Sequence, residues 1–328
     1  MSKSKRIPVL APGADKRRIR SVFKNNEGNM RLGWLITFSV MGYFVLDRIL
    51  FALLTMVFLR LFNAWNVTVD NYLHAPGWAQ IVFQGYQGII SVIVSFAILG
   101  LSAGLIRLCK ISFKNDRSPD RRWKHCLFAF LAASCATFIF YMLFKQIDSY
   151  RMEPTAASAH IALIILRFII LALRLFAEAL FTKSVLMDGF QERGHVCWAP
   201  VFAGVWMILS QLGGIANIIS AVNWMFLGLL IGLIYQRYGL WAGFGLRLGW
   251  QMVHQICFGF GGSTQTSVCQ LYAVSEIALT GGDGGMPYGF GMTILLTAGI
   301  LLLQKQGIID CFERLKQKRP KSHNFKPV

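Results

Sequence analysis

Two groups of charged and amide side chains recur along the sequence at helical spacing. The first group is His160, Arg167, Arg174 and Glu178, and the second group is Arg247, Gln251 and His254. Separations of 7, 7 and 4 residues in the first group, and of 4 and 3 in the second, place each group on one face of a helix. Arg174 and Glu178 are an i, i+4 pair, so we expect them to interact directly. The carboxylate could serve as a general base, whereas the cations could hold an anion.

The segments that carry these groups are apolar. Of the 328 residues, 55% are hydrophobic and only 15% are charged, and the mean hydropathy is +0.51. Soluble domains contain about 25% charged residues. The composition therefore excludes a soluble globular enzyme as the main body of the chain, and it equally excludes a disordered or collagen-like chain.

Eight mostly apolar segments are long enough to cross a membrane, which takes about 20 residues. They are 33–62, 81–106, 126–144, 160–182, 198–216, 218–236, 240–260 and 287–304. The predicted fold class is therefore all-α, a polytopic integral membrane bundle of about eight transmembrane helices. The first segment carries Asp47 and Arg48 near its middle, and we expect these two to pair with each other.

The Lys and Arg residues between these segments predict the topology. Connections that would lie on one side hold 26 of them, and those on the other side hold only Lys145 and Arg151. By the positive-inside rule, this asymmetry places both termini in the cytoplasm. The expected location is a bacterial cytoplasmic (inner) membrane.

Four regions follow from this arrangement. They are a basic cytoplasmic tail at 1–32, an N-terminal transmembrane extension at 33–125, a transmembrane core at 126–304 and a second basic tail at 305–328. The first tail lacks the interleaved aromatic residues or a motif for nucleic-acid binding, so its expected partner is anionic membrane lipid and not nucleic acid. The seven Cys residues show no metal-ligand spacing, and we expect neither a metal nor a cofactor.

A purely structural interpretation of the polar groups is that they form an interior hydrogen-bond network that fixes helix packing. Three GxxxG pairs also predict close helix packing. They are Gly100 with Gly104, Gly228 with Gly232, and Gly245 with Gly249.

Three stretches together resemble the motifs of the CPBP family, the CAAX-protease and bacteriocin-processing intramembrane proteins, which include the type II CAAX prenyl endopeptidases. Residues 177–183, AEALFTK, are similar to the first motif, EExxFRG, and 202–206, FAGVW, to the second, FxxxH. Residues 247–251, RLGWQ, follow a Gly-rich apolar stretch and a Leu-Trp pair and are similar to the third motif, HxxxN. The resemblance covers about residues 165–300 and implies a polytopic helical bundle.

The resemblance implies a site from which nearly all catalytic residues have been lost. In active relatives the leading Glu of the first motif and the His of the second are thought to activate water, and the His and Asn of the third to stabilise the oxyanion. The positions that match the family's Glu, Arg, His, His and Asn here are Ala177, Thr182, Trp206, Arg247 and Gln251. Only the second Glu of the first motif is retained, as Glu178.

These replacements argue against hydrolysis. Alanine has no lone pair, an indole nitrogen only donates, and a guanidinium cannot bind a metal. If the family's packing holds, Glu178 forms a charge-paired cluster with Arg174 and Arg247, near Gln251 and Arg167, with Trp206 filling the place of the second motif's His. The cluster would have an excess of positive charge, so either an acidic residue such as Asp47 approaches it or an anion occupies it.

The sequence therefore predicts a CPBP-like pseudoprotease, a non-catalytic membrane binding or regulatory protein with a peptide, a lipid or a protein partner in the former active-site cavity. One alternative is a divergent intramembrane endopeptidase that uses Glu178 as its base, with His254 as a substitute base. A second alternative is a transporter that binds an anion or a lipid headgroup through Arg167, Arg174 and Arg247. The oligomeric state is left open.

Overall fold

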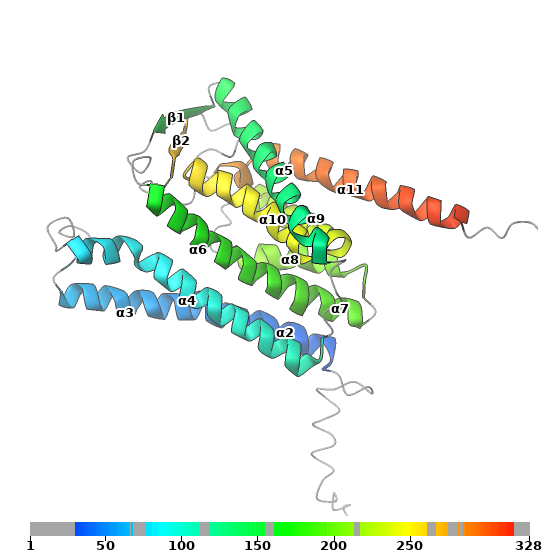
Figure 1. Ribbon diagram of the computed structural model, residues 1–328, viewed down its shortest axis with the longest axis horizontal. Coiled ribbons are helices and arrows are strands. Elements are labelled where there is room, and N and C mark those ends of the chain that lie inside the picture. Colours follow the sequence, from blue (N-terminus) through cyan, green and yellow to red (C-terminus); the bar gives the residue numbers. More distant parts are fainter. Residues whose placement is uncertain are drawn as a thin grey trace, which may run out of the picture. The chain divides into compact units, whose positions relative to one another are not determined.

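A computed structural model of the chain is mostly helical (Figure 1). It describes residues 30–65, 67, 77–111, 119–147, 149–154, 161–193, 195–212, 217–260, 267–274, 281 and 285–317. The chain folds as two compact units. Unit 1 is 1–113 with 184–196, and unit 2 is 114–183 with 197–328. The boundaries predicted at 32, 125 and 304 remain predictions.

Unit 1 begins with one long helical run that has an irregular centre. Helix α2 (Leu32–Phe44) continues into the π-helical segment η1 (Val45–Leu50) and then into α3 (Phe51–Ala64). Helix α4 (Gly77–Cys109) packs against this run, and the short α7 (Asp188–Glu192) contacts α2. Most buried side chains of this unit are apolar or aromatic, but serines and the carboxylates Asp47 and Asp188 are buried with them.

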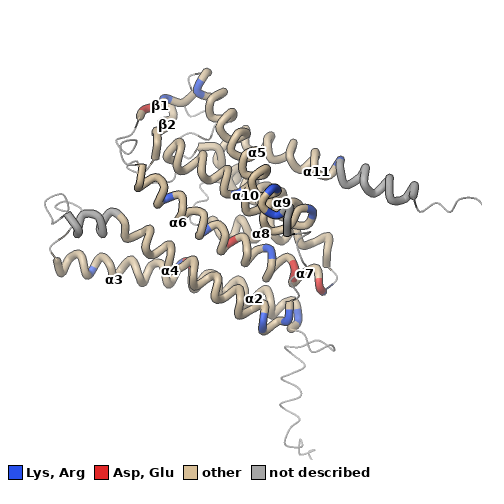
Figure 2. The backbone as a smooth tube through the Cα atoms, viewed as in Figure 1, with Lys and Arg blue, Asp and Glu red and all other residues tan. Residues whose placement is uncertain are grey.

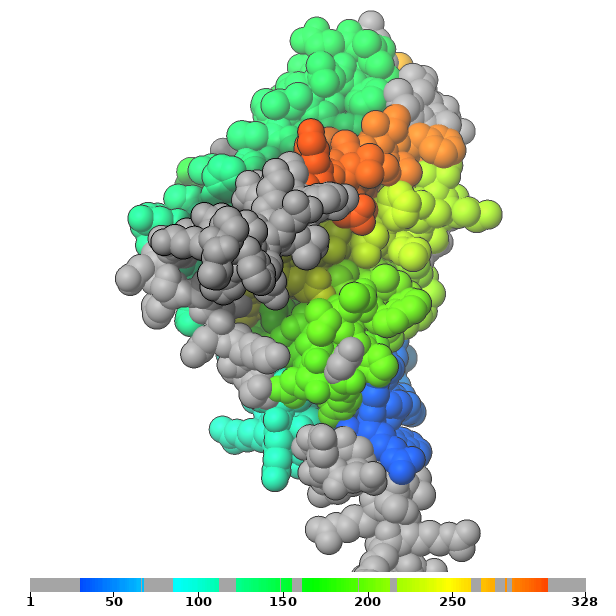
Figure 3. All heavy atoms as spheres, turned by 90° about the vertical axis from the view of Figure 1, so that its right-hand side faces the viewer, coloured from blue at the N-terminus to red at the C-terminus, as the bar shows by residue number. Residues whose placement is uncertain are grey.

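Unit 2 holds the remaining long helices. They are α5 (Pro119–Gln146), α6 (Ile161–Leu180), α8 (Ala199–Ser210), α9 (Ile218–Tyr238), α10 (Leu240–Gln251) and α11 (Phe290–Gln317). Helix α10 packs on α5 and α6, α8 packs on α9, and α11 also packs on α9, as the orange and yellow-green atoms of Figure 3 show. An Asn217 capping box begins α9, and Gly239, at φ 85°, separates α9 from α10.

Two further π-helical segments follow directly on α-helices in the apolar segments of the chain. Segment η4 (Phe181–Met187) continues α6, and η6 (Met252–Cys257) continues α10. Together with η1, these segments lie at or beside the polar residues of the predicted spans: Asp47 in η1, Glu178 just before η4 and His254 in η6. An extra residue in a helical turn frequently marks a functional position.

The predicted span count is met only in part. Within the described ranges, three helices are long and apolar enough to cross a membrane: Gly85–Cys109, Arg122–Gln146 and Ile218–Tyr238. Helices also occupy the other five predicted segments, but they are short, as in α8, broken by a π segment, as in α10, or carry three charged residues, as in α6. Figure 2 shows how few charged residues the helices carry. The number of eight stays a prediction.

The all-α prediction did not include a small sheet. Strand β1 (Tyr150–Pro154) pairs antiparallel with β2 (Cys269–Ala273), with Tyr150 opposite Ala273. Both strands come from connections between predicted spans, where the sequence shows no clear alternation. Their pairing depends on the helices that bring two segments more than 100 residues apart to the same end of unit 2.

The three GxxxG pairs differ in how closely a neighbouring helix approaches them. A Cβ atom on Gly245 or Gly249 would overlap the carbonyl oxygens of Cys126 or Phe130 on α5. A Cβ on Gly228 would likewise overlap the backbone of α8. Around Gly100 and Gly104, however, no described atom lies within 4 Å of such a Cβ. The packing role predicted for that pair is therefore not seen in the structure.

We expect Gly249→Ala to lower the free energy of unfolding by about 1–3 kcal/mol, because α10 and α5 must separate to admit the methyl group. Gly104→Ala provides the matched control in an equally apolar helix and should leave stability unchanged or raise it slightly. Thermal unfolding of both variants in the same detergent measures the difference. Equal midpoints for the two variants would contradict the assigned contact.

Candidate functional site

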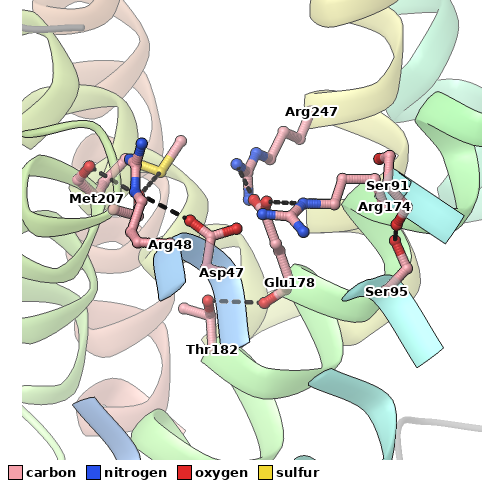
Figure 4. Close-up of polar contacts among 10 residues, drawn as sticks. Asp47, Arg48, Ser91, Ser95, Arg174, Glu178, Thr182, Met207 and Arg247 are labelled. Atoms are coloured by element: carbon pink, nitrogen blue, oxygen red, sulfur yellow. Dashed lines mark hydrogen bonds and ion pairs between the residues drawn. The ribbon is translucent and has the colours of Figure 1, made fainter. Parts of the chain in front are cut away.

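The centre of the candidate site is a buried carboxylate held by two arginines (Figure 4). Arg174 and Glu178 lie one turn apart on α6, and Nε of Arg174 donates to Oε1 of Glu178 at 2.8 Å. Arg247 reaches the other oxygen, Oε2, from α10 through its Nη2. Both oxygens of Glu178 are therefore engaged in charge-assisted hydrogen bonds.

The cluster is withdrawn from solvent. Glu178 is 8% exposed and Arg247 5%, whereas the Arg174 side chain is 19% exposed. Burial strengthens the attraction between the three charges and also makes each of them costly to leave unpaired. One carboxylate faces two guanidinium groups, so the described cluster carries one net positive charge.

The backbone at Glu178 is tied to the π segment that follows it. The hydroxyl of Thr182 donates to the carbonyl oxygen of Glu178 at 2.8 Å (Figure 4). Such back-bonding satisfies the buried hydroxyl of Thr182 within its own helix and often accompanies a local bend. Thr182 stands at the position where the resemblance expects an arginine.

Three buried polar atoms on α10 have no hydrogen-bond partner within the described part of the chain. They are Nε of Arg247, Nε1 of Trp250 and Oε1 of Gln251. Arg247 and Gln251 lie one turn apart, so a donor and an acceptor come from the same stretch of α10. Buried groups of this kind normally have partners, so water or a ligand group would satisfy them.

His254 belongs to a second, aromatic cluster at the end of α10. Its Nδ1 lies 2.6 Å from the hydroxyl of Tyr141 on α5, and its ring stacks on those of Trp250 and Phe260. The amide of Met286 in η9 (Met286–Tyr288) donates to the same hydroxyl at 3.0 Å. The Tyr141 hydroxyl therefore accepts from the Met286 amide and also shares a hydrogen bond with Nδ1 of His254, whose direction depends on the tautomer of the imidazole ring.

The remaining predicted site residues lie on several elements. Ala177 is fully buried beside Glu178 on α6, and Trp206 of α8 is 3% exposed and packs on Phe181, 5.2 Å between ring centroids. Arg167 is half-buried two turns before Arg174. Asp47 is in unit 1, where its Oδ2 lies 3.2 Å from Nε of Arg48, as expected for a neighbouring pair. His160 lies outside the described residues.

Sequence reasoning missed two buried residues that organise this unit. Asn223 on α9 donates through Nδ2 to the carbonyl oxygens of Pro287 and Gly289, at 2.9 Å each, and its Oδ1 accepts from Thr293 at 2.6 Å. Tyr141 links three elements, as described above. An Asn within an apolar segment is a signal that could have been used, whereas a Tyr among many aromatic residues is not.

The arrangement suits charge pairing and binding better than hydrolysis. In the described ranges, no three His, Cys, Asp or Glu side chains come together to hold a metal ion. The indole of Trp206 cannot accept a proton, and His254 is engaged by Tyr141. Glu178 is the only carboxylate of the cluster, and its oxygens already hold two cations.

Comparison of the chain with models of known protein families, with curated proteins and with solved structures finds no match.

Proposed function

We propose that this protein is a CPBP-like integral membrane protein that binds a partner without cleaving it. The likeness to the family rests on the three sequence motifs. The proposed loss of activity rests on the residues that replace the family's catalytic residues. The observation that carries the proposal is the state of Glu178, whose two oxygens are both bound by buried arginines.

The chemistry supports this in two ways. A general base must offer a lone pair to water and must accept a proton at low cost. Two guanidinium groups bind both oxygens of Glu178, so neither oxygen is left free to take a proton from water. No second base stands beside it among the described residues, because Trp206 and Arg247 occupy the positions of the family's histidines.

The same cluster offers features that a binding protein can use. The unpartnered Nε of Arg247 and Oε1 of Gln251 offer one donor, on a cation, and one acceptor to an anionic or strongly polar group. A peptide segment, a lipid headgroup or a polar residue of a partner helix presents such groups. The bound partner would thus be held where relatives of the family hold a substrate.

The experiment is a comparison of protein N-termini by mass spectrometry in three strains: a deletion strain, wild type, and Glu178→Gln at matched membrane abundance. Glutamine keeps the size of the side chain and one acceptor oxygen, but it cannot act as a base. Identical N-terminal profiles in all three strains are expected. New N-termini that appear with wild type and vanish with Glu178→Gln would establish proteolysis with Glu178 as the base and overturn the proposal.

A further inference from the structure

One end of unit 1 gathers cations from three helices. They are Arg31 before α2, Arg107 and Lys110 at the end of α4, and Arg193 after α7. We call these four residues the basic end. Arg31, Arg107 and Lys110 are exposed. Figure 2 shows blue segments together where α2 begins and α4 ends.

Specific contacts hold this end together. Arg193 donates from Nε and Nη2 to the carbonyl oxygen of Met30, at 3.1 and 3.0 Å, and from Nη1 to that of Gly189 at 2.7 Å. The thiol of Cys109 lies 3.9 Å from the sulfur of Met30. Met30, which precedes Arg31, thereby contacts Cys109, which precedes Lys110. The cations at the start of α2 and at the end of α4 are therefore neighbours.

Lys110 adopts a conformation that favours glycine. Its φ is 51°, the only positive φ of a non-glycine residue in the described chain, and its amide donates to the carbonyl of Arg107 at 3.3 Å to close the end of α4. A glycine would take this conformation without a steric cost. Glycine would end the helix equally well, so the lysine at this position indicates a role for its positive charge.

The basic end lies where a candidate membrane span ends. The apolar span Gly85–Cys109 stops one residue before Lys110, and Trp34 lies in the first turn of α2. Cations directly after an apolar span, with a tryptophan nearby, lie at headgroup level. Of the acidic residues, Asp188 and Glu192 on α7 belong to this end, which leaves an excess of cations.

The chain that precedes the basic end adds further positive charge. Residues 1–29 contain eight Lys and Arg and two acidic residues. We infer that the basic end is a docking site for the phosphate of anionic phospholipids in the same bilayer. Lys110, Arg31 and Arg107 would contact the headgroup, while Arg193 fixes the backbone that positions them. This site is separate from the Glu178 cluster and does not depend on the function proposed for it.

The test uses the full chain in neutral detergent, titrated with a short-chain phosphatidylglycerol while thermal unfolding is recorded. Phosphatidylcholine and inorganic phosphate are the controls for a neutral lipid and for a free anion. Phosphatidylglycerol should raise the unfolding midpoint, and the two controls should not. In Lys110→Gly the apparent affinity should fall about fivefold, as expected for one cation at a lipid surface.

The same variant separates lipid binding from a structural role. Because glycine suits φ 51°, Lys110→Gly should unfold without lipid at the same temperature as wild type or higher. Lys110→Arg should keep the affinity, and Arg60→Gln, which removes an exposed cation of α3, should not change it. Equal stabilisation of wild type and Lys110→Gly by phosphatidylglycerol would overturn the proposal. Tighter binding of a short RNA, lost in Lys110→Gly, would also overturn it in favour of nucleic acid.

Discussion

Replacing Arg247 with methionine is expected to lower the free energy of unfolding by about 3–5 kcal/mol. Methionine fills a similar volume but removes the positive charge that Arg247 presents to Oε2 of Glu178. The carboxylate would remain 8% exposed with only Arg174 as its partner. Leaving a buried charge partly unpaired costs far more than a surface ion pair contributes, because water cannot replace the lost partner.

The control for this prediction is an ion pair in solvent. Nε of Arg151 lies 3.2 Å from Glu153 on β1, with the two side chains 75% and 47% exposed, so Arg151→Met should cost less than about 1 kcal/mol. Exchanging the charges, with Glu178→Arg and Arg247→Glu together, should restore part of the stability lost in Arg247→Met. Unfolding in detergent followed by tryptophan fluorescence measures all three. If Arg247→Met unfolds at the wild-type midpoint, the pairing does not stabilise the fold.

Asn223→Ala is the second substitution with a large expected effect, a loss of about 3 kcal/mol or more. Three hydrogen bonds disappear at once, and the carbonyl oxygens of Pro287 and Gly289 stay buried without their donor. An unpaired buried polar group costs about 1–3 kcal/mol. The turn at η9 would also loosen, and with it the amide of Met286 that supports Tyr141.

Two milder variants make this prediction specific. Thr293→Val removes only the hydrogen bond to Oδ1 of Asn223 and should cost about 1 kcal/mol. Asn217→Ala removes the cap of the same helix and should also cost about 1 kcal/mol. Denaturant unfolding of the three variants gives the order. A loss in Asn223→Ala no larger than in Asn217→Ala would show that the turn is held by other contacts.

The spacing of residues along one helix predicted part of the candidate site. The i, i+4 relation of Arg174 and Glu178 makes their contact a property of α6 alone, so it could be expected from the sequence. The link from Glu178 to Arg247 spans 69 residues. The two polar stripes were expected to face each other, but the pairing of these two residues was expected only through the resemblance to a family with known packing. The apolar segments likewise gave the places of the helices, because burial of 20 or so apolar residues admits few other structures.

Other features depend on which surfaces meet, and spacing says nothing about that. The motif GxxxG is the same at Gly100 and at Gly245, yet only the latter approaches another backbone in the described structure. His254 was a candidate base from its position on one face with Arg247, but Tyr141, 113 residues away, binds its Nδ1.

The sequence by itself determined the helices, their apolar character and the charged stripe of α6, since these follow from composition and the 3.6-residue period. Only the tertiary structure decided that both oxygens of Glu178 are occupied, that Asn223 holds the turn at η9, and that Arg193 binds the carbonyl oxygen of Met30. The physical reason is that a hydrogen bond between distant residues forms only where packing of the helices brings donor and acceptor together, and that packing is the sum of many weak contacts along the whole chain.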